Sequence, residues 1–379
     1  MNSISETTPP DTHRHLNFDV IKMIIIFGLV PVHLFERCVL FEDYSVSHVG
    51  FTSIDSVLST IIEFADGTIG ACMFMFCLGA GLVFSLRKSA KFLLKRSGVL
   101  IIAAFVLALL TNTISLTIKS NLFQDPSLFE QGIWWLFCCD ILNFASLAFL
   151  FFALVRKFKL PNWLVLAIPV ILLIISSFIP EMIFPDSIVA ADLMGWIVFQ
   201  ATEYSFFPFM QWIIFPAAGY VFAQLLLKAE NREMFYGFTM LIGAAAFALI
   251  TAISVLCGVD ITTFFSTFNA YIYNKTPLSA AWSLSFMLFW VSLFFFLTRK
   301  ISPASRFSRF AVSVSRRITV FYCLQWIIIG FLGFWVLPAL GILPLNFAQM
   351  FLFAAAIIVV CYILAGFILK LLQKKRMSA

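Results

Sequence analysis

The strongest constraint on this chain is a succession of long apolar runs. A helix needs about 20 mostly apolar residues to cross the hydrocarbon core of a bilayer, and ten runs approach that length. They are residues 18–40, 67–86, 93–118, 133–155, 161–180, 205–227, 235–257, 278–298, 317–337 and 347–370. Because backbone groups in lipid must be hydrogen-bonded within the protein, we predict an all-α polytopic bundle of about ten membrane-spanning helices.

Basic residues gather in every second loop, after the second, fourth, sixth, eighth and tenth runs. The first three clusters are Arg87, Lys88, Lys91, Lys95 and Arg96, then Arg156, Lys157 and Lys159, then Lys228 and Arg232. The other loops are acidic or nearly neutral. Cytoplasmic loops carry the excess of Lys and Arg, so we expect both termini on the cytoplasmic side. These loops also account for the net charge of +6, and no nucleic-acid partner is expected.

Composition leaves little room for a separate soluble domain, since 62% of the 379 residues are hydrophobic and 12% are charged. We predict a polar cytoplasmic tail at 1–17, a membrane domain at 18–371 and a basic cytoplasmic tail at 372–379. The first run is too long for a cleavable signal and is expected to be retained. The eight cysteines lack paired metal-ligand spacing, so we expect buried free thiols and no metal.

The first run, FDVIKMIIIFGLVPVHLFE, contains the sharpest polar pattern. Asp19, Lys22 and His33 lie at membrane depth, where ionisable groups are costly and usually functional. The eleven-residue step from Lys22 to His33 returns to within about 20° of one helix face, about 16 Å further along. Pro31 is expected to kink the helix. Glu36, one turn beyond His33, is placed to support it as a base. The alternatives are a packing histidine and a lysine that reaches the interface.

Other polar residues interrupt later runs. Asp140 and Asn143 are one turn apart and are expected to face the bundle interior, as is Gln325, although each can serve as an interhelical hydrogen bond. The segment LRKSAKFLLKRSG is either topogenic and lipid-attracting or a clamp for a phosphorylated ligand. Gly79 and Gly98 are interpreted as sites of close helix packing.

A family resemblance follows from these residues. The opening HLNFDVIKMIIIFGLVPVHLFE resembles the start of bacterial membrane acyltransferases of the acyltransferase 3 type, in which a basic residue, ten intervening residues and a histidine form a signature. The stretches MFMFCLGAGLVFSLRKSAKFLLKRSGVLI and FPFMQWIIFPAAGYVFAQLLLK are similar to the related group that includes heparan-α-glucosaminide N-acetyltransferase. Two positions depart from the pattern: Lys22 replaces the commoner Arg, and Gln325 stands where a His is frequent.

The resemblance implies transfer of an acyl group, usually acetyl, from cytoplasmic acetyl-CoA to a hydroxyl or amine of an extracytoplasmic acceptor such as a glycan sugar. His33 would be the general base or a transient acyl carrier, with Glu36 and Asp140 as catalytic supports. Asp19, Asn143 and Gln325 would line the substrate cavity. The residues expected to hold acyl-CoA are Lys22, Arg87, Lys88, Lys91, Lys95 and Arg96.

The resemblance also implies a bacterial inner-membrane location in contact with lipid, and an oligomer is possible. The main alternative function is a transporter or flippase without covalent chemistry. Transporters often place broken helices at matching positions of two halves, whereas Pro31 has no evident counterpart in the second half of this chain.

Overall fold

Helices dominate the part of the chain that the structure describes. The computed structural model describes residues 15–39, 52–85, 89–179, 187–198, 206–265 and 273–377, and it contains no strand within them. The predicted all-α fold is therefore confirmed.

The helices of the first half follow one another with few interruptions. They are α1 (Leu16–Leu34), η1 (Phe35–Val39), α2 (Ser53–Phe64), η2 (Ala65–Cys72), α3 (Met73–Phe84), α4 (Ala90–Ala108), η3 (Leu109–Thr113), α5 (Ile114–Phe123), α6 (Pro126–Phe137), α7 (Ile141–Lys157) and α8 (Asn162–Ser176). The first three η segments have the wider π-helical winding.

The second half contains the longest uninterrupted helices. They are α9 (Ile188–Gly195), α10 (Phe209–Trp212), α11 (Ile214–Lys228), α12 (Arg232–Leu256), the 3₁₀ turn η5 (Ile261–Phe264), α13 (Pro277–Thr298), α14 (Arg306–Phe331), the π-helical η6 (Leu332–Val336), α15 (Leu337–Ala339) and α16 (Phe347–Met377).

Eight helical segments among the described residues are long and apolar enough to cross a membrane. They are Leu16–Val39, Ser53–Phe84, Ala90–Phe123, Phe209–Lys228, Arg232–Leu256, Pro277–Thr298, Arg306–Ala339 and Phe347–Lys374. The two remaining predicted runs coincide with shorter helices, α7 of 17 residues and α8 of 15 residues.

The fourth predicted run, 133–155, is two elements rather than one. It begins inside α6 and continues into α7, and the chain breaks out of helix at Cys138 and Cys139 before Asp140 starts α7 as its N-cap. Asp favours such a start because its short polar side chain competes with the helical backbone. The break places a carboxylate within the bundle.

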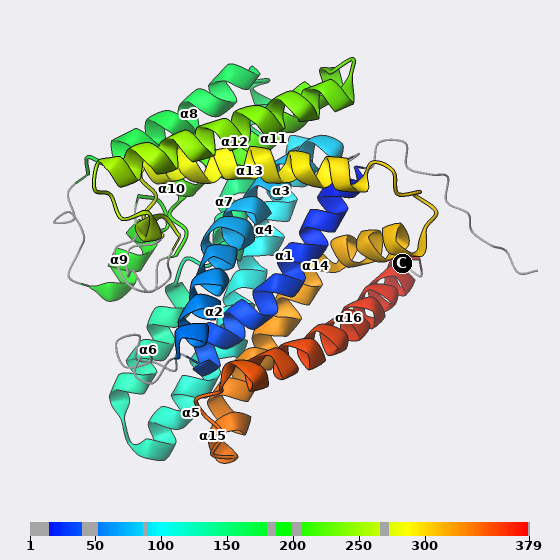
Figure 1. The fold of residues 1–379 in the computed structure, drawn as a ribbon. Coiled ribbons are helices and arrows are strands. Elements are labelled where there is room, and N and C mark those ends of the chain that lie inside the picture. The colour runs from blue at the N-terminus through cyan, green and yellow to red at the C-terminus, as the bar shows by residue number, and fades with distance from the viewer. Residues whose placement is uncertain are drawn as a thin grey trace, which may run out of the picture.

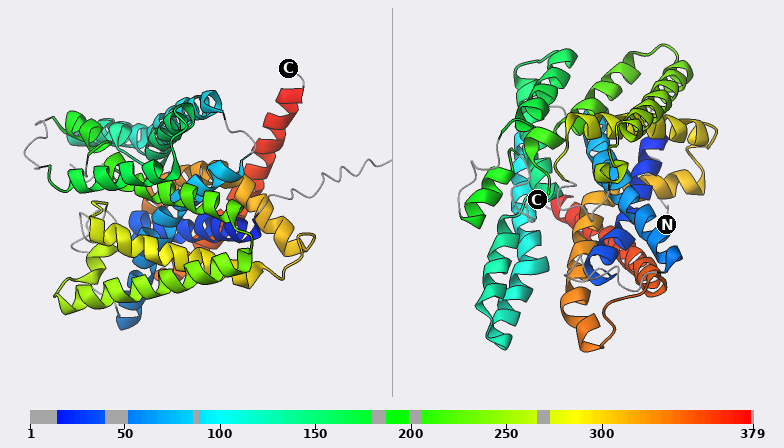
Figure 2. Two further views of the ribbon diagram at one scale, coloured as in Figure 1. Left: turned by 90° about the horizontal axis from the view of Figure 1, so that it is seen from above. Right: turned by 60° about the vertical axis from the view of Figure 1, so that its left-hand side comes forward.

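The arrangement separates two ends of the molecule. α1 packs on α14, α14 on α16, α4 on α7, α3 on α11 and α12 on α13. In Figure 1, α8, α11, α12 and α13 lie across the top, while α5, α6 and α15 form the opposite end. The right-hand view of Figure 2 keeps these groups apart, and its left-hand view shows the red end of α16 projecting beyond the other helices.

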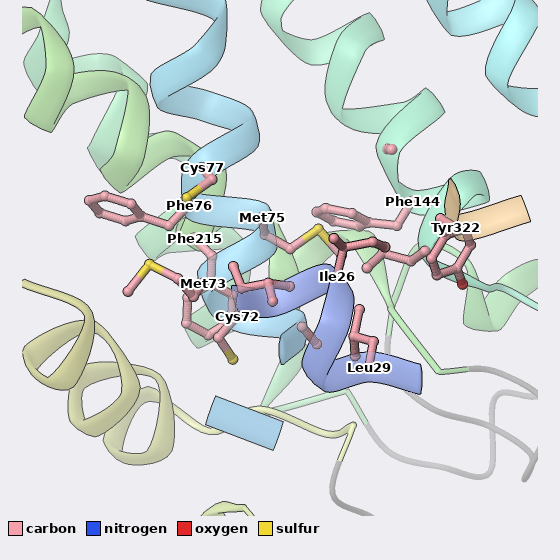
Figure 3. Packing of buried hydrophobic residues seen from close by; sticks show 14 of the residues in the cluster. Ile26, Leu29, Cys72, Met73, Met75, Phe76, Cys77, Phe144, Phe215 and Tyr322 are labelled. Carbon is pink, nitrogen blue, oxygen red and sulfur yellow. The ribbon is translucent and has the colours of Figure 1, made fainter. Parts of the chain in front are cut away.

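Apolar side chains from distant parts of the sequence fill the centre. Figure 3 shows Ile26 and Leu29 of α1 beside Met75 of α3, with Phe144 of α7 and Tyr322 of α14 nearby; all five belong to one buried cluster that spans the bundle. This packing fixes α1 against α3, α7 and α14, and α1, α7 and α14 also line a cavity.

The cysteine prediction is confirmed in large part. All eight are free thiols, and six of them are buried. Cys257 is exposed because it follows the end of α12, and Cys323 of α14 is half-buried where it packs against the core.

Two glycines allow α3 and α11 to touch backbone to backbone. A Cβ at Gly79 would overlap the carbonyl of Pro216, and a Cβ at Gly219 would overlap the carbonyl of Phe76. Small residues at membrane helix contacts permit this close approach. The packing predicted for Gly79 is therefore found, whereas Gly98 faces open space on the exposed side of α4.

Gly79→Ala is expected to destabilise the fold by about 1–3 kcal/mol, since the added methyl forces two helix backbones apart. Gly98→Ala is the matched control, because nothing lies within 4 Å of its added methyl. Thermal unfolding of the two purified variants in detergent tests this. Equal melting temperatures for both would contradict the close α3–α11 contact.

Candidate active site

A cavity of about 430 Å³ opens among α1, α4, α6, α7 and α14. All four π-helical segments in the described part of the chain contribute to its wall, for example Glu36 of η1, Asp66 of η2, Asn112 of η3 and Phe334 of η6. π-Helical turns occur often at functional sites. Their coincidence here marks the cavity as the place where the bundle departs from regular helix.

His33 lies in this wall, with 7% of its surface exposed. Its ring stacks on Trp326 with centroids 4.1 Å apart, and Nδ1 lies 3.3 Å from Nε2 of Gln325. Tyr322 meets the ring edge-on at 6.2 Å between centroids. Gln325 and Trp326 both lie about one helical turn beyond Tyr322, so all three are on the side of α14 that faces His33. One face of α14 therefore holds the imidazole in place.

Gln325 also controls which ring nitrogen carries the proton. As placed, its amide N–H donates to Nδ1, whereas its buried Oε1 has no hydrogen-bond partner within the described residues. A 180° turn of the amide exchanges the two atoms, and Nδ1–H then donates to Oε1. That arrangement leaves Nε2 of His33 as the basic nitrogen, the form that a general base requires.

Asp140 enters the cavity at the start of α7. Tyr322 donates its hydroxyl hydrogen bond to Asp140 Oδ2 at 2.9 Å, and the backbone N–H of Asp140 donates to Asn143 Oδ1 at 3.3 Å. Both Asp140 and Asn143 line the cavity. The residue that holds Asp140 therefore also contacts the ring of His33, so that α14 links the two groups.

Three charged residues of the wall, Arg37, Asp66 and Lys119, were not among the predicted site residues. Arg37 follows His33 by four positions and so lies on the same face; extending the first-helix stripe by one residue would have found it. Asp66 directly precedes the predicted run 67–86, and the structure buries it in η2. Glu36 lies within Coulombic range of Asp66, Arg37 and Asp140, which makes the cavity strongly polar.

Lys275 supports the Asp66 side of the cavity from outside the spans. Its side chain is 1% exposed, its Nζ donates to the carbonyl of Phe264 at 3.2 Å, and its backbone N–H donates to Gln211 Oε1 at 2.9 Å. Burial lowers the pKa of Lys275, and the nearby Cys72 and Asp66 oppose that shift. The ammonium thereby places a positive charge behind the Asp66 carboxylate.

The acyltransferase domain of the acyltransferase 3 family matches residues 15–366. The chain belongs to this family. No curated protein and no solved structure matches it. With its eight long apolar helices, the protein is an integral membrane acyltransferase, and the cavity around His33 is its candidate active site.

Five of the predicted site residues of this acyltransferase lie in or directly behind the cavity wall. His33, Glu36, Asp140 and Asn143 line the cavity, and Gln325 bonds to His33 from behind. The ring partner expected for His33 was Glu36, whereas its described hydrogen-bond partner is Gln325. α1 also continues as helix through Pro31 and widens into η1 only at Phe35.

The residues expected to hold acyl-CoA lie elsewhere. Lys22 and Asp19 are near Cys77 of α3 and are not among the cavity residues. Lys91 and Lys95 are exposed at the start of α4, and Arg96 contacts Thr319 of α14 at 3.5 Å. The two further predicted contacts, Arg87 and Lys88, lie outside the described residues. The donor role of these basic residues stays a prediction.

Gln325→Leu is expected to slow acyl transfer by about tenfold, equivalent to ~1.4 kcal/mol of activation free energy, because the imidazole loses its hydrogen-bond partner. Gln325→His restores a hydrogen-bonding ring and is expected to retain more activity. Turnover of purified variants checks both.

Gln224→Leu provides the matched control, since Gln224 bonds to Tyr220 on α11, away from the cavity. If Gln325→Leu and Gln224→Leu reduced turnover equally, Gln325 would have no special role in positioning His33.

Proposed function

We propose that this acyltransferase moves an acyl group, by default acetyl, from cytoplasmic acetyl-CoA to a hydroxyl or amine of an extracytoplasmic acceptor, with a glycan sugar as the expected class. The observation that carries the proposal is the position of His33. It lies on a polar cavity within a family of acyltransferases, fixed by Gln325 and Trp326. Histidine held in this way is suited to remove a proton from an attacking hydroxyl.

The chemistry balances with His33 as the base. The imidazole takes the proton of the acceptor O–H or N–H while that atom attacks the thioester carbonyl. The C–S bond breaks as the tetrahedral intermediate collapses, and the departing CoA thiolate takes the proton from the imidazolium. His33 ends as it began. If His33 instead carries the acyl group, its unprotonated ring nitrogen attacks the thioester carbonyl and the C–S bond breaks. The departing CoA thiolate takes the ring N–H proton. The acceptor then attacks the acyl-imidazole, the acyl–nitrogen bond breaks, and the acceptor proton returns to the imidazole.

The charges around His33 suit this reaction. Asp140 and Glu36 supply carboxylates that stabilise the imidazolium formed in the transition state, and Tyr322 fixes Asp140 through its hydroxyl. Arg37 lies within Coulombic range of His33, Glu36 and Asp140, and the two carboxylates offset the effect of its positive charge on the imidazolium.

The inner basic residues are within reach of the cavity. Lys95 precedes the cavity residue Ala104 by nine positions of α4, a rise of about 14 Å. The extended pantetheine arm of a CoA molecule spans that length. Phosphates held at Lys91 and Lys95 are therefore compatible with a thioester placed at His33. No observation favours the transporter alternative over acyl transfer.

His33→Ala and His33→Gln are expected to reduce label transfer from radiolabelled acetyl-CoA to a panel of extracytoplasmic sugars by about 10²–10⁴-fold, the usual contribution of a general base. Binding of acetyl-CoA, measured by equilibrium dialysis on the same preparations, should be unchanged. His15→Ala, at the other end of α1, is the control for loss of a histidine as such.

The same experiment separates the two roles of His33. Label that stays on the wild-type protein when no acceptor is added identifies an acyl carrier, whereas transfer without such label identifies a base. Turnover by His33→Ala at the wild-type rate would exclude both roles.

A further inference from the structure

Two cations line the cavity without a carboxylate bound to them. Arg37 of η1 and Lys119 of α5 both belong to the wall. The ion pair found among the described residues joins Arg299 to Glu233, and none involves Arg37 or Lys119 within 4.0 Å. Charged side chains in a membrane interior normally pair with an opposite charge. These two are therefore available to an anion that comes from outside the chain.

Arg37 is held in a fixed orientation. Its guanidinium lies 4.5 Å from the ring centroid of Trp135 and 5.7 Å from that of Trp326, and its Nη2 donates to Asn112 Oδ1 at 2.9 Å. The amide of Asn112 is fixed in turn, since its Nδ2 donates to Thr111 Oγ1 at 3.1 Å. A guanidinium stacked on indoles and held at one N–H edge has its other donors preorganised for a planar or tetrahedral anion.

Both cations belong to the cavity wall, and Arg37 lies within Coulombic range of Glu36 and Asp140 without an ion pair to either among the described residues. Arg37 contacts Asn112 of η3 and Trp135 of α6, and Lys119 lies over Phe334 with its Nζ 5.1 Å from the ring centroid. Asp66, in η2, lies within Coulombic range of Lys275. Glu36 is near Arg37 but further than the salt-bridge distance.

The same wall lies far from the basic cluster expected to hold CoA phosphates. Lys91 and Lys119 sit near opposite ends of one continuous helical segment, Ala90–Phe123, and their 28-residue separation corresponds to about 40 Å. An anion at Arg37 and Lys119 therefore belongs to the second substrate rather than to the phosphate end of the donor.

We infer that Arg37 and Lys119, with Asn112, Gln131 and Trp135, form an anion subsite for the acceptor. The acceptor of this acyltransferase then carries a carboxylate or phosphate close to the group that is acylated, and its sugar ring lies against the indole of Trp135. This inference rests on the proposed function, because it assigns a chemical class to the acceptor.

The test compares two probes that differ in one carboxylate, methyl β-D-glucuronide and methyl β-D-glucoside. Full-length protein in lipid nanodiscs is expected to bind the glucuronide about tenfold more tightly than the glucoside. A difference of this size is what one charge-assisted hydrogen bond to the carboxylate contributes. Arg37→Gln and Lys119→Gln should each reduce this preference, and the double variant should abolish it. The controls are Arg309→Gln and Lys157→Gln, because both residues are exposed and lie outside the cavity.

A parallel measurement of acetyl-CoA binding distinguishes an acceptor anion from a donor anion. The inference requires acetyl-CoA affinity to stay within about twofold in Arg37→Gln and Lys119→Gln. Loss of acetyl-CoA binding with an unchanged sugar preference would assign the cations to the donor and overturn it. Equal binding of both sugars by the wild type, or binding of neither, would also overturn it.

Failure of this inference can be told from failure of the proposed function. If label transfer depends on His33 but the wild type does not prefer the charged sugar, the acyl transfer stands and the anion subsite does not. If the charged sugar binds through Arg37 but no transfer from acetyl-CoA occurs, the subsite stands and the reaction does not.

Discussion

Backbone groups in lipid must remain hydrogen-bonded within the protein. A site with many polar side chains must therefore be built while the backbone hydrogen bonds of the helices stay intact. This bundle meets the requirement by widening four of its helices instead of ending them. α1 continues into η1 as far as Val39, and in η2, η3 and η6 the winding changes while the helix continues on both sides. The wider turn shifts the side chains that follow it around the helix axis, and each of these segments places side chains in the cavity wall. The break in the wall before Asp140 is closed by the cap of α7 and by Tyr322.

α14 is the second element on which the site depends. It touches His33 through Gln325 and Trp326, and it touches Asp140 through Tyr322. It also packs along α1, so the helix that carries His33 and the helix that positions it are held together over many turns. A shift between these two helices would change the stacking distance, the amide contact and the Asp140 contact at once.

The sequence predicted most of the helices because about 20 apolar residues in a row have few alternatives to crossing a membrane. It missed the amphipathic beginnings, such as the start of α14 at Arg306, since hydropathy detects contact with lipid and not helicity. It indicated His33, Glu36 and Asp140 as functional candidates because ionisable groups at membrane depth are costly and are seldom kept without a function. It missed Arg37, which resembled an ordinary charged flank at the end of an apolar run.

The contact between His33 and Gln325 joins residues 292 positions apart, and no periodicity in one sequence can reveal such a pair. The same holds for Asp66 and Lys275, which are brought together by the packing of η2 and the segment before α13. Composition and spacing therefore indicated which residues to consider, whereas tertiary packing decided which of them act together.

The short helices α7 and α8 have a consequence for the surrounding lipid. Their 17 and 15 residues rise about 26 and 22 Å, less than the roughly 30 Å of a typical hydrocarbon core. A bilayer accommodates short apolar helices by thinning around them. α7 carries Asp140 and Asn143, so the thinned zone adjoins the cavity. Under the proposed transfer from a cytoplasmic donor to an extracytoplasmic acceptor, such thinning would shorten the path of the acyl group, and membrane thickness would become one of the quantities that set it.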